Sequence, residues 1–376
     1  MSLVVLTNIP TPYRTAFFDA LAEAAAQAGR RFHVLYCAKT EPGRHWPYEP
    51  AKMRHAHTVL RGFHPAFAGL HAHLNPGVLS ELNLLKPDTL LLAGAWNTPT
   101  MLIAGLNIYA PNPRRLFWSE GHAGSALNKS GAIAWLRRRI YRTYDGFVVP
   151  NQASLDWARQ QAGEPKPCFL IPNSIDVGFY ARKSPAVRLE ARRRLGLPEQ
   201  GRVLVQVGLL ASAKGAPELA RAFLGLPADV RRDAMLTLVG AGPAEEELRK
   251  AAAGSGGALR LLGQLSPEGV RDALWAADAF VLNTRRDSNP LSAIEAAAAG
   301  LPVVMSAAAG NVREVVEAPK AGFVIGDPSD PAAALRALLS ASDAQLAEMG
   351  TRAAELARSQ FDAAVVAKSL IKQLYP

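Results

Sequence analysis

Cysteine is scarce in this sequence, and other marks of common protein classes are missing. Only two cysteines, Cys37 and Cys168, occur among 376 residues, and their wide separation predicts neither a disulfide framework nor a zinc finger. The first residues, MSLVVLTNIPTPYR, lack the basic start and long apolar run of a signal peptide. The most hydrophobic later stretch, residues 89–110, is interrupted by two asparagines and a proline, so no membrane span is expected. These absences favour a cytoplasmic protein.

Acidic residues are few in the first half of the chain. Residues 1–185 contain 20 Lys and Arg against 11 Asp and Glu, whereas residues 186–376 contain 22 against 21. Such an excess of positive charge attracts nucleic acid, anionic lipid or an anionic substrate, and the charge alone does not choose among them. No signature of an RRM, KH or helix-turn-helix domain accompanies it, so nucleic acid is not expected as a partner.

Short apolar runs alternate with amphipathic stretches in both halves. The expected strands are residues 3–7, 32–36, 89–93, 146–149 and 168–171, then 203–207, 235–239, 259–262, 279–282 and 303–305. Expected helices include residues 16–28, 216–224, 244–253, 267–276 and 291–299. This β-α-β-α order predicts an α/β protein with two Rossmann-like domains, each a parallel sheet with helices on both faces.

A charged, proline-containing segment separates the two series of elements. It covers residues 181–200, and we place the domain boundary there. The expected parts are an N-terminal domain over residues 1–185, a C-terminal domain over residues 186–355, and a closing helix over residues 356–376 that leans back on the N-terminal domain.

Two carboxylates eight positions apart form the sharpest motif. Asp287 precedes a helix that carries Glu295, and Asn289 and Pro290 suit the N-cap and first helical position. In an open α/β sheet, ligands bind beyond the carboxyl ends of the strands, where a helix N-terminus favours phosphate. A diphosphate sugar suits such a place.

The run from Asp287 to Glu295, with the Ala-rich helix and Gly-Leu-Pro-Val-Val that follow, resembles glycosyltransferase family 4, also called glycosyl transferases group 1, of the kind that builds bacterial surface polysaccharides. The resemblance implies the GT-B fold, in which two Rossmann-like domains face each other across a cleft. It also implies that Glu295 binds the ribose of a nucleotide-sugar donor and that Asp287 contacts the sugar. Asp287 is one methylene shorter than the family's Glu. The residues between the two acids that would line the donor site are Ser288, Asn289, Pro290 and Leu291.

A glycine-containing loop follows the first strand of the second half. Gly208 permits a close approach of the backbone to a ligand, and Lys214 at a helix start is a cation where a phosphate would lie. The loop resembles the family's V-G-R-L-x-x-x-K-G, in which Arg and Lys hold the diphosphate. Here Leu209 replaces that Arg, so weaker donor binding is expected, or Arg285 or Arg286 substitutes.

Two further stretches of the second half take their meaning from the same resemblance. The run Gly240-Ala-Gly-Pro matches only half of the dinucleotide-binding motif, so we interpret it as a structural turn. Gln264, after the next strand, is expected beside the nucleobase.

The first half supplies candidate acceptor-side residues. Tyr13 and Arg14 leave the first strand in a loop that resembles the opening loop of these enzymes, and they would bind the acceptor. His122 aligns with a histidine that the family often keeps near the transferred sugar, and Glu120 would share that site. The expected catalytic residues are therefore His122, Lys214 and Asp287.

Two basic segments of the first half leave alternatives open. Residues 129–143 predict either a basic amphipathic helix for an anionic membrane surface or a packed helix with a solvated face. Residues 44–73 hold six histidines among aromatic residues, and an acceptor-side loop is favoured over a metal site because no carboxylate or cysteine cluster accompanies them.

The resemblance implies a retaining transfer of sugar to a glycan or lipid-linked acceptor. No Asp-x-Asp occurs, so no metal or other cofactor is expected, and Lys214 with helix amides would neutralise the leaving diphosphate. Peripheral contact with the inner face of the cell membrane remains open. The alternatives are a GT-B sugar-nucleotide epimerase or phosphorylase, and a non-catalytic sugar-nucleotide binder.

Overall fold

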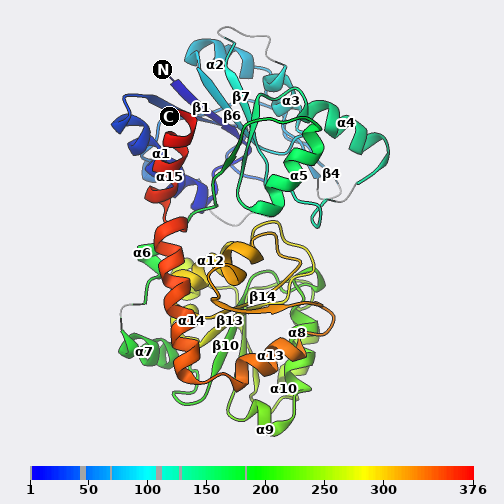
Figure 1. Ribbon diagram of the computed structural model, residues 1–376, viewed down its shortest axis with the longest axis vertical. Coiled ribbons are helices and arrows are strands. Elements are labelled where there is room, and N and C mark those ends of the chain that lie inside the picture. The colour runs from blue at the N-terminus through cyan, green and yellow to red at the C-terminus, as the bar shows by residue number, and fades with distance from the viewer. Residues whose placement is uncertain (1, 43–47, 68–69, 107–111, 127–128, 183) are drawn as a thin grey trace. The chain divides into compact units, whose positions relative to one another are not determined.

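The chain forms two compact units, each built on one parallel sheet (Figure 1). The computed structural model describes residues 2–42, 48–67, 70–106, 112–126, 129–182 and 184–376. Unit 1 consists of residues 1–175 and 363–376, and unit 2 of residues 176–362. Parts of the histidine-rich segment (44–47) and of the apolar stretch (107–110) lie outside the described residues.

The sheet of unit 1 has the strand order β3-β2-β1-β6-β7-β8-β9, with every pair parallel. Its strands are β1 (Ser2–Thr7), β2 (Arg31–Tyr36), β3 (His57–Val59), β6 (Thr89–Ala93), β7 (Arg114–Trp118), β8 (Gly146–Val149) and β9 (Cys168–Leu170). A short antiparallel pair, β4 (Ala66–Phe67) and β5 (Leu70–His71), stands apart from it. The chain runs outward from β1 in one direction and then from β6 in the other, so the order reverses between these two strands.

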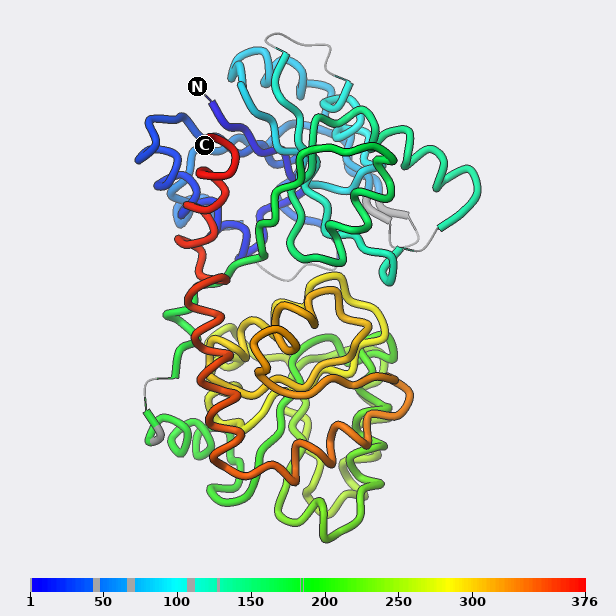
Figure 2. The backbone as a smooth tube through the Cα atoms, viewed as in Figure 1, coloured from blue at the N-terminus to red at the C-terminus, as the bar shows by residue number. Residues whose placement is uncertain are grey.

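Helices cover both faces of this sheet. They are α1 (Pro12–Gln27), α2 (Val78–Leu85), α3 (Pro99–Gly105), α4 (Gly131–Tyr141), α5 (Gln152–Ala162) and α15 (Ala363–Leu374), with a short 3-10 turn η1 (Pro50–Lys52). On one face, Phe18 and Leu21 of α1 pack with Leu370 of α15, and Figure 2 shows this last segment of the chain lying beside the first helix. On the other face, Leu82 of α2 and Met101 of α3 pack against the sheet.

The sheet of unit 2 has the order β12-β11-β10-β13-β14-β15, again all parallel. Its strands are β10 (Val203–Val207), β11 (Met235–Val239), β12 (Leu259–Gly263), β13 (Ala279–Leu282), β14 (Val303–Ser306) and β15 (Gly322–Ile325). The order reverses between β10 and β13. Central strands such as β10, β13 and β14 are buried along their whole length, as expected for a parallel sheet covered on both faces.

The remaining elements of unit 2 surround this sheet. They are α6 (Val177–Tyr180), α7 (Pro185–Leu195), η2 (Ser212–Lys214), α8 (Ala216–Leu224), α9 (Ala228–Arg231), α10 (Glu245–Ala253), α11 (Pro267–Ala276), α12 (Leu291–Ala298), η3 (Arg313–Glu317), α13 (Ala332–Ser340), α14 (Asp343–Leu356) and η4 (Ala357–Phe361). Phe223 of α8, Leu248 of α10 and Leu335 of α13 form the core on one face.

The predicted fold class is confirmed, and the ten predicted strands are present within two residues of their expected bounds. The two units divide after residue 175, ten residues before the predicted boundary, because α6 and α7 pack on α11 and α12 of unit 2. The helix that returns to unit 1 is α15, which begins at residue 363 instead of 356. Among the described residues, no helix combines the length and apolar character that a membrane span needs.

Candidate functional site

A lysine and an aspartate meet where the strand order of unit 2 reverses. Lys214 ends the turn η2 after β10, and Asp287 lies in the loop after β13. The Lys214 ammonium donates a hydrogen bond to Oδ2 of Asp287, and the side chains are 28% and 16% exposed. Because β10 and β13 are neighbours, their carboxyl ends form the crevice in which open α/β sheets bind ligands.

The loop of Asp287 is held by its own backbone and side chain. Oδ1 of Asp287 accepts the backbone N–H of Asn289 at 3.2 Å, and its carbonyl accepts the N–H of Gly310 at 2.9 Å. The predicted N-cap was wrong by one residue: α12 begins at Leu291 with Pro290 as its cap, since Asn289 is drawn into the turn of Asp287. Asn289 and Pro290 are buried, and Ser288 and Leu291 are partly exposed.

Glu295, one turn into α12, is held by a tyrosine that the sequence analysis missed. The hydroxyl of Tyr180, the last residue of α6, donates to Oε1 of Glu295 at 2.9 Å. Burial raises the pKa of Glu295, and the hydrogen bond from Tyr180 acts in the opposite direction. Burial and the neighbouring Glu295 carboxylate also raise the pKa of Tyr180, so the phenol remains the donor.

Glycines bring the loops at this edge close together. Gly215 has φ +65°, and a Cβ there would lie 1.8 Å from the carbonyl oxygen of Asn283. Gly240 has φ +133°, and its Cβ would lie 2.0 Å from the carbonyl oxygen of Gly208. The Gly240 turn thus packs directly against the Gly208 loop, and its interpretation as a structural turn stays a prediction that this packing supports.

The remaining predicted donor residues lie along the same edge of the sheet. Gln264 follows β12 and is exposed. Leu209 is 53% exposed, so an apolar side chain stands in the loop where the family has Arg. Of the two proposed substitutes, Arg285 donates to Glu218 at 2.8 Å, and Arg286 is exposed.

In unit 1, the predicted acceptor residues converge at the carboxyl ends of β1, β6 and β7. Arg14 donates to Glu120 at 2.7 Å and to the Tyr13 hydroxyl at 3.0 Å, and its guanidinium lies 5.3 Å from the centre of the Trp118 ring. These side chains line a polar pocket of about 280 Å³. The pocket also contains buried Oδ1 of Asn8, for which the described residues provide no hydrogen-bond donor.

The electrostatics of this pocket keep Arg14 charged. Burial acts to lower the pKa of Arg14, but Tyr13 and Glu120 outweigh it, and the pKa lies above its usual value. Burial raises the pKa of Tyr13, so its phenol stays neutral. The pocket therefore combines a fixed cation and carboxylate with a neutral phenol, which suits hydroxyl groups of a sugar.

The structure does not bring His122 into this pocket. Its side chain is 6% exposed, and Nδ1 accepts the backbone N–H of Gly124 at 3.2 Å. The carbonyl of His122 accepts the N–H groups of Ser125 and Ala126, as in a tight local turn. A role for His122 beside the transferred sugar stays a prediction.

One histidine of the histidine-rich segment contacts a residue that lines the polar pocket. Nε2 of His73 lies 2.9 Å from Oε1 of Glu41, which lines the pocket, and Nδ1 of His73 lies 3.1 Å from Nδ1 of His64. Within the described part of the chain, no three His, Cys, Asp or Glu side chains are placed to hold a metal ion.

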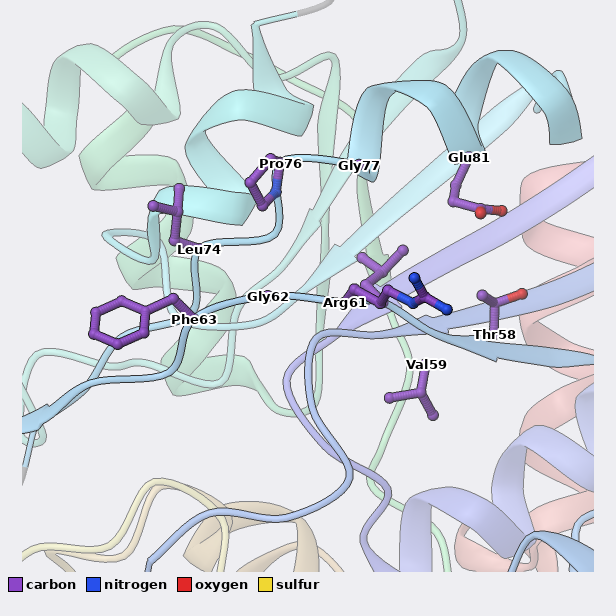
Figure 3. Close-up of a pocket in the computed structure, with 10 residues that line it drawn as sticks. Thr58, Val59, Arg61, Gly62, Phe63, Leu74, Pro76, Gly77 and Glu81 are labelled. Carbon is purple, nitrogen blue, oxygen red and sulfur yellow. The ribbon is translucent and has the colours of Figure 1, made fainter.

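A larger groove of about 610 Å³ lies beside this segment (Figure 3). Phe63 and Leu74 pair through backbone hydrogen bonds at one end, and Glu81 of α2 stands at the other. None of the predicted site residues lines it, so we place the chemistry at the smaller pocket and at the edge of unit 2.

Residues 187–360 match the family described as Glycosyl transferases group 1. A D-inositol 3-phosphate glycosyltransferase of Geodermatophilus obscurus is 35% identical over 209 residues, which are 51% of this chain and 45% of that protein. A GDP-mannose-dependent monoacylated alpha-(1-6)-phosphatidylinositol monomannoside mannosyltransferase of Corynebacterium glutamicum is 26% identical over 234 residues, which are 60% of each chain. The matched region thus spans only about half to three fifths of these relatives.

Solved structures resemble the whole chain. The crystal structure of Anabaena HepE in complex with UDP has a TM-score of 0.76 at 18% identity, covering 100% of this chain and 99% of that one. Sucrose-phosphate synthase from Thermosynechococcus elongatus gives 0.73 at 18% identity, with coverage of 100% and 98%. Identity this low shows the fold alone. The solved structures thus show that this chain has the GT-B fold, and the family match shows that residues 187–360 are similar to the group 1 glycosyltransferases.

Proposed function

We propose that the chain transfers a sugar from a nucleoside-diphosphate sugar to a hydroxyl group of an acceptor. One observation carries this proposal: Lys214, Asp287 and the Tyr180-bound Glu295 gather at the carboxyl edge of unit 2, where the strand order reverses. A cation for phosphate and two carboxylates for hydroxyl groups are the groups that such a donor needs. A solved structure of HepE with UDP-glucose shows a donor of this class bound to a protein of the same fold, and another holds UDP.

The ion pair between Lys214 and Asp287 suggests how the site receives the donor. The diphosphate would replace Asp287 as the ion-pair partner of the Lys214 ammonium. The Asp287 carboxylate would then accept hydrogen bonds from the sugar hydroxyls. Glu295 would accept from the ribose. Lys214 and the backbone amides at the start of α12 would stabilise the negative charge that develops on the leaving diphosphate.

The finer features of the reaction belong to the same proposal. We propose retention of the anomeric configuration on the resemblance to the family, and a reaction without a metal ion because Lys214 supplies the cation at the diphosphate. The acceptor hydroxyl would be bound in the polar pocket of unit 1 by Arg14, Glu120 and Tyr13. A glycan or lipid-linked acceptor would present several hydroxyl groups to this set.

The test is release of nucleoside diphosphate from UDP-, GDP- and ADP-sugars with membrane extract as acceptor. We expect release that depends on the extract and that falls at least about tenfold in Lys214→Ala and Glu295→Ala, since each substitution removes a charge-assisted contact. Lys250→Ala is the matched control, because Lys250 is an exposed lysine on α10. Binding without release would support a non-catalytic binder, and interconversion of sugar nucleotides without acceptor would support an epimerase.

The outer side of α4 supports peripheral attachment to an anionic membrane. Ala134, Arg137 and Tyr141 face the interior, whereas Ile133, Trp135 and Leu136 are 50%, 62% and 45% exposed. Residues 129–142 contain five Lys and Arg and no Asp or Glu. Exposed apolar groups surrounded by cations are the composition of a helix that lies in the lipid interface.

Vesicle sedimentation tests this attachment. The intact chain should bind vesicles that contain phosphatidylglycerol more strongly than vesicles of phosphatidylcholine, and Trp135→Ser with Ile133→Ser should abolish the binding. Leu84→Ser with Leu106→Ser serves as the control, because both leucines are exposed and lie away from α4, in α2 and directly after α3. Equal binding by both variants would contradict a role of α4.

A further inference from the structure

Unit 2 has a pocket at the edge of its sheet that lies opposite the proposed donor site. It has a volume of about 600 Å³ and is lined by residues that directly precede strands: Arg202 before β10, Asp278 before β13 and Pro302 before β14. Arg182 and Arg188 complete its charged wall. This volume is in the range of small-molecule sites in proteins.

Positive charge exceeds negative charge in and behind this wall. Both oxygens of Asp278 are already engaged, since Oδ1 accepts from Arg188 at 2.5 Å and Oδ2 accepts from the buried Arg192 at 2.5 Å. Oδ2 also accepts the backbone N–H of Val203 at 2.8 Å. One carboxylate therefore serves two guanidinium groups.

Arg182 is the third guanidinium, and it is poorly compensated. Its hydrogen bonds go to the carbonyl oxygens of Trp275 at 3.5 Å and Ala277 at 3.4 Å, which is the outer limit for such contacts. Among the described residues, no carboxylate forms an ion pair with it. Burial lowers the pKa of Arg182; the attraction of Asp278 opposes this, and the repulsion of Arg188 and Arg192 adds to it.

Arg202 adds a fourth cation on the other side of the pocket. It donates to the carbonyls of Leu339 at 2.8 Å and Ala341 at 2.6 Å, at the end of α13. Its ion pair with Asp343 at 3.1 Å involves a carboxylate that is almost fully exposed. Solvent screens such a pair, so it neutralises little of the charge inside the pocket.

We propose that this pocket is a binding site for a small phosphate-bearing anion, held by Arg182, Arg188 and Arg202. A planar guanidinium matches the oxygens of a phosphate group with two parallel hydrogen bonds, and its charge would be compensated by the ligand. The site is separate from the proposed donor site because it lies at the amino ends of the strands. The inference does not depend on the proposed transfer reaction, since it concerns binding alone.

Isothermal titration calorimetry of inorganic phosphate and of glucose 6-phosphate tests the site. The titrations use the full-length Lys214→Ala variant, so that the predicted diphosphate cation does not contribute. We expect one molecule bound per chain, with an affinity at least about tenfold lower after the further substitution Arg182→Gln, as expected for a lost charge-assisted contact. Tighter binding of inorganic phosphate would identify the free ion as the ligand, and tighter binding of glucose 6-phosphate a phosphorylated metabolite.

Two further variants keep this test decisive. Arg193→Gln is the matched control. Arg193 lies on α7, the helix that carries Arg188, but it is exposed, pairs with Glu199 and does not line the pocket. Arg188→Lys keeps the charge but loses the two-pronged geometry, and it should weaken binding without loss of the Asp278 ion pair. No detectable binding of either ligand to the Lys214→Ala chain, or equal affinity with and without Arg182, would overturn the proposal.

Discussion

Leu209 stands in the loop after β10 where the family that this chain resembles has an arginine. The loop is held by backbone contacts, and the Leu209 side chain points out far enough to be 53% exposed. Leu209→Arg should therefore fit without repacking and strengthen binding of a nucleoside diphosphate by about tenfold or more, since it adds one charge-assisted hydrogen bond. Calorimetry with UDP and GDP measures the change, and Leu209→Gln is the uncharged control. An unchanged dissociation constant would show that this position does not face the diphosphate.

Tyr180 gives a pH-dependent prediction at the same site. Its hydrogen bond counteracts the effect of burial on the pKa of Glu295, so Tyr180→Phe should raise that pKa further. If the ionised carboxylate accepts from the ribose, nucleotide affinity is lost as the pH falls through the pKa of Glu295. The loss should then begin at a higher pH in the variant than in the parent chain. Titrations from pH 4.5 to 8 measure this, with Tyr375→Phe as the control, and coincident profiles would contradict it.

The position of a residue could be predicted where it depends on the strand that the residue follows. It could not be predicted where it depends on contacts between elements that no sequence pattern links. The proximity of Lys214 and Asp287 could be expected, because each lies in the loop region that follows one of two neighbouring strands of the same sheet. Tyr180 could not, because it lies in a short helix 115 residues before Glu295 and no spacing links the two. His122 shows the converse, since its place in the motif gave no sign that the side chain would be buried in a local turn.

At the scale of elements, Gly215 decides how η2 passes into α8. Gly215→Ala should destabilise the chain by about 2–5 kcal/mol, because it combines a left-handed backbone with overlap on the carbonyl of Asn283. Thermal denaturation measures this. Gly29→Ala is the control: its φ is +67°, but a Cβ there meets nothing within 4 Å, so only the backbone cost of about 1–2 kcal/mol is expected. Equal losses in the two variants would contradict the importance of the close approach.

The buried strands were the elements that sequence predicted best. Runs such as residues 203–207 and 235–239 are apolar except for the buried Gln206 and Thr237, because both faces of a parallel sheet are covered. Among the strands of the two parallel sheets, β3, β7 and β15 were absent from the expected ranges. β3 and β15 lie at sheet edges and are only partly buried, whereas the central β7 begins with two arginines and is not a continuous apolar run. The start of α12 was misplaced by one residue because a side-chain contact of Asp287, invisible in propensities, competes for Asn289.

For the whole molecule, the contribution of α15 to unit 1 can be tested by truncation. Removal of residues 363–376 would expose Phe17, Phe18 and Leu21, which pack with Val366 and Leu370. Unit 1 should then lose its cooperative unfolding transition and bind the dye ANS, whereas unit 2 retains its own core. Differential scanning calorimetry distinguishes the unfolding transitions of the two units, and removal of Pro376 alone is the control. Two intact transitions in the truncated chain would contradict the prediction.

The two-unit architecture itself was predictable because the β-α-β-α pattern is continuous in each half and changes character between them. The division point was not, because the segment 176–182 follows unit 1 without a break in composition and is assigned to unit 2 only by its packing.

The discontinuity of unit 1 also has a consequence for synthesis on the ribosome. Its first 175 residues emerge early, but the helix that covers the apolar side of α1 emerges only after unit 2. Unit 2 is contiguous and can complete its core while unit 1 still exposes phenylalanines to the cytosol. Since domains generally fold as units as they leave the ribosome, the order of completion here is reversed, and the apolar surface of the nascent first unit stays exposed until α15 has been synthesised.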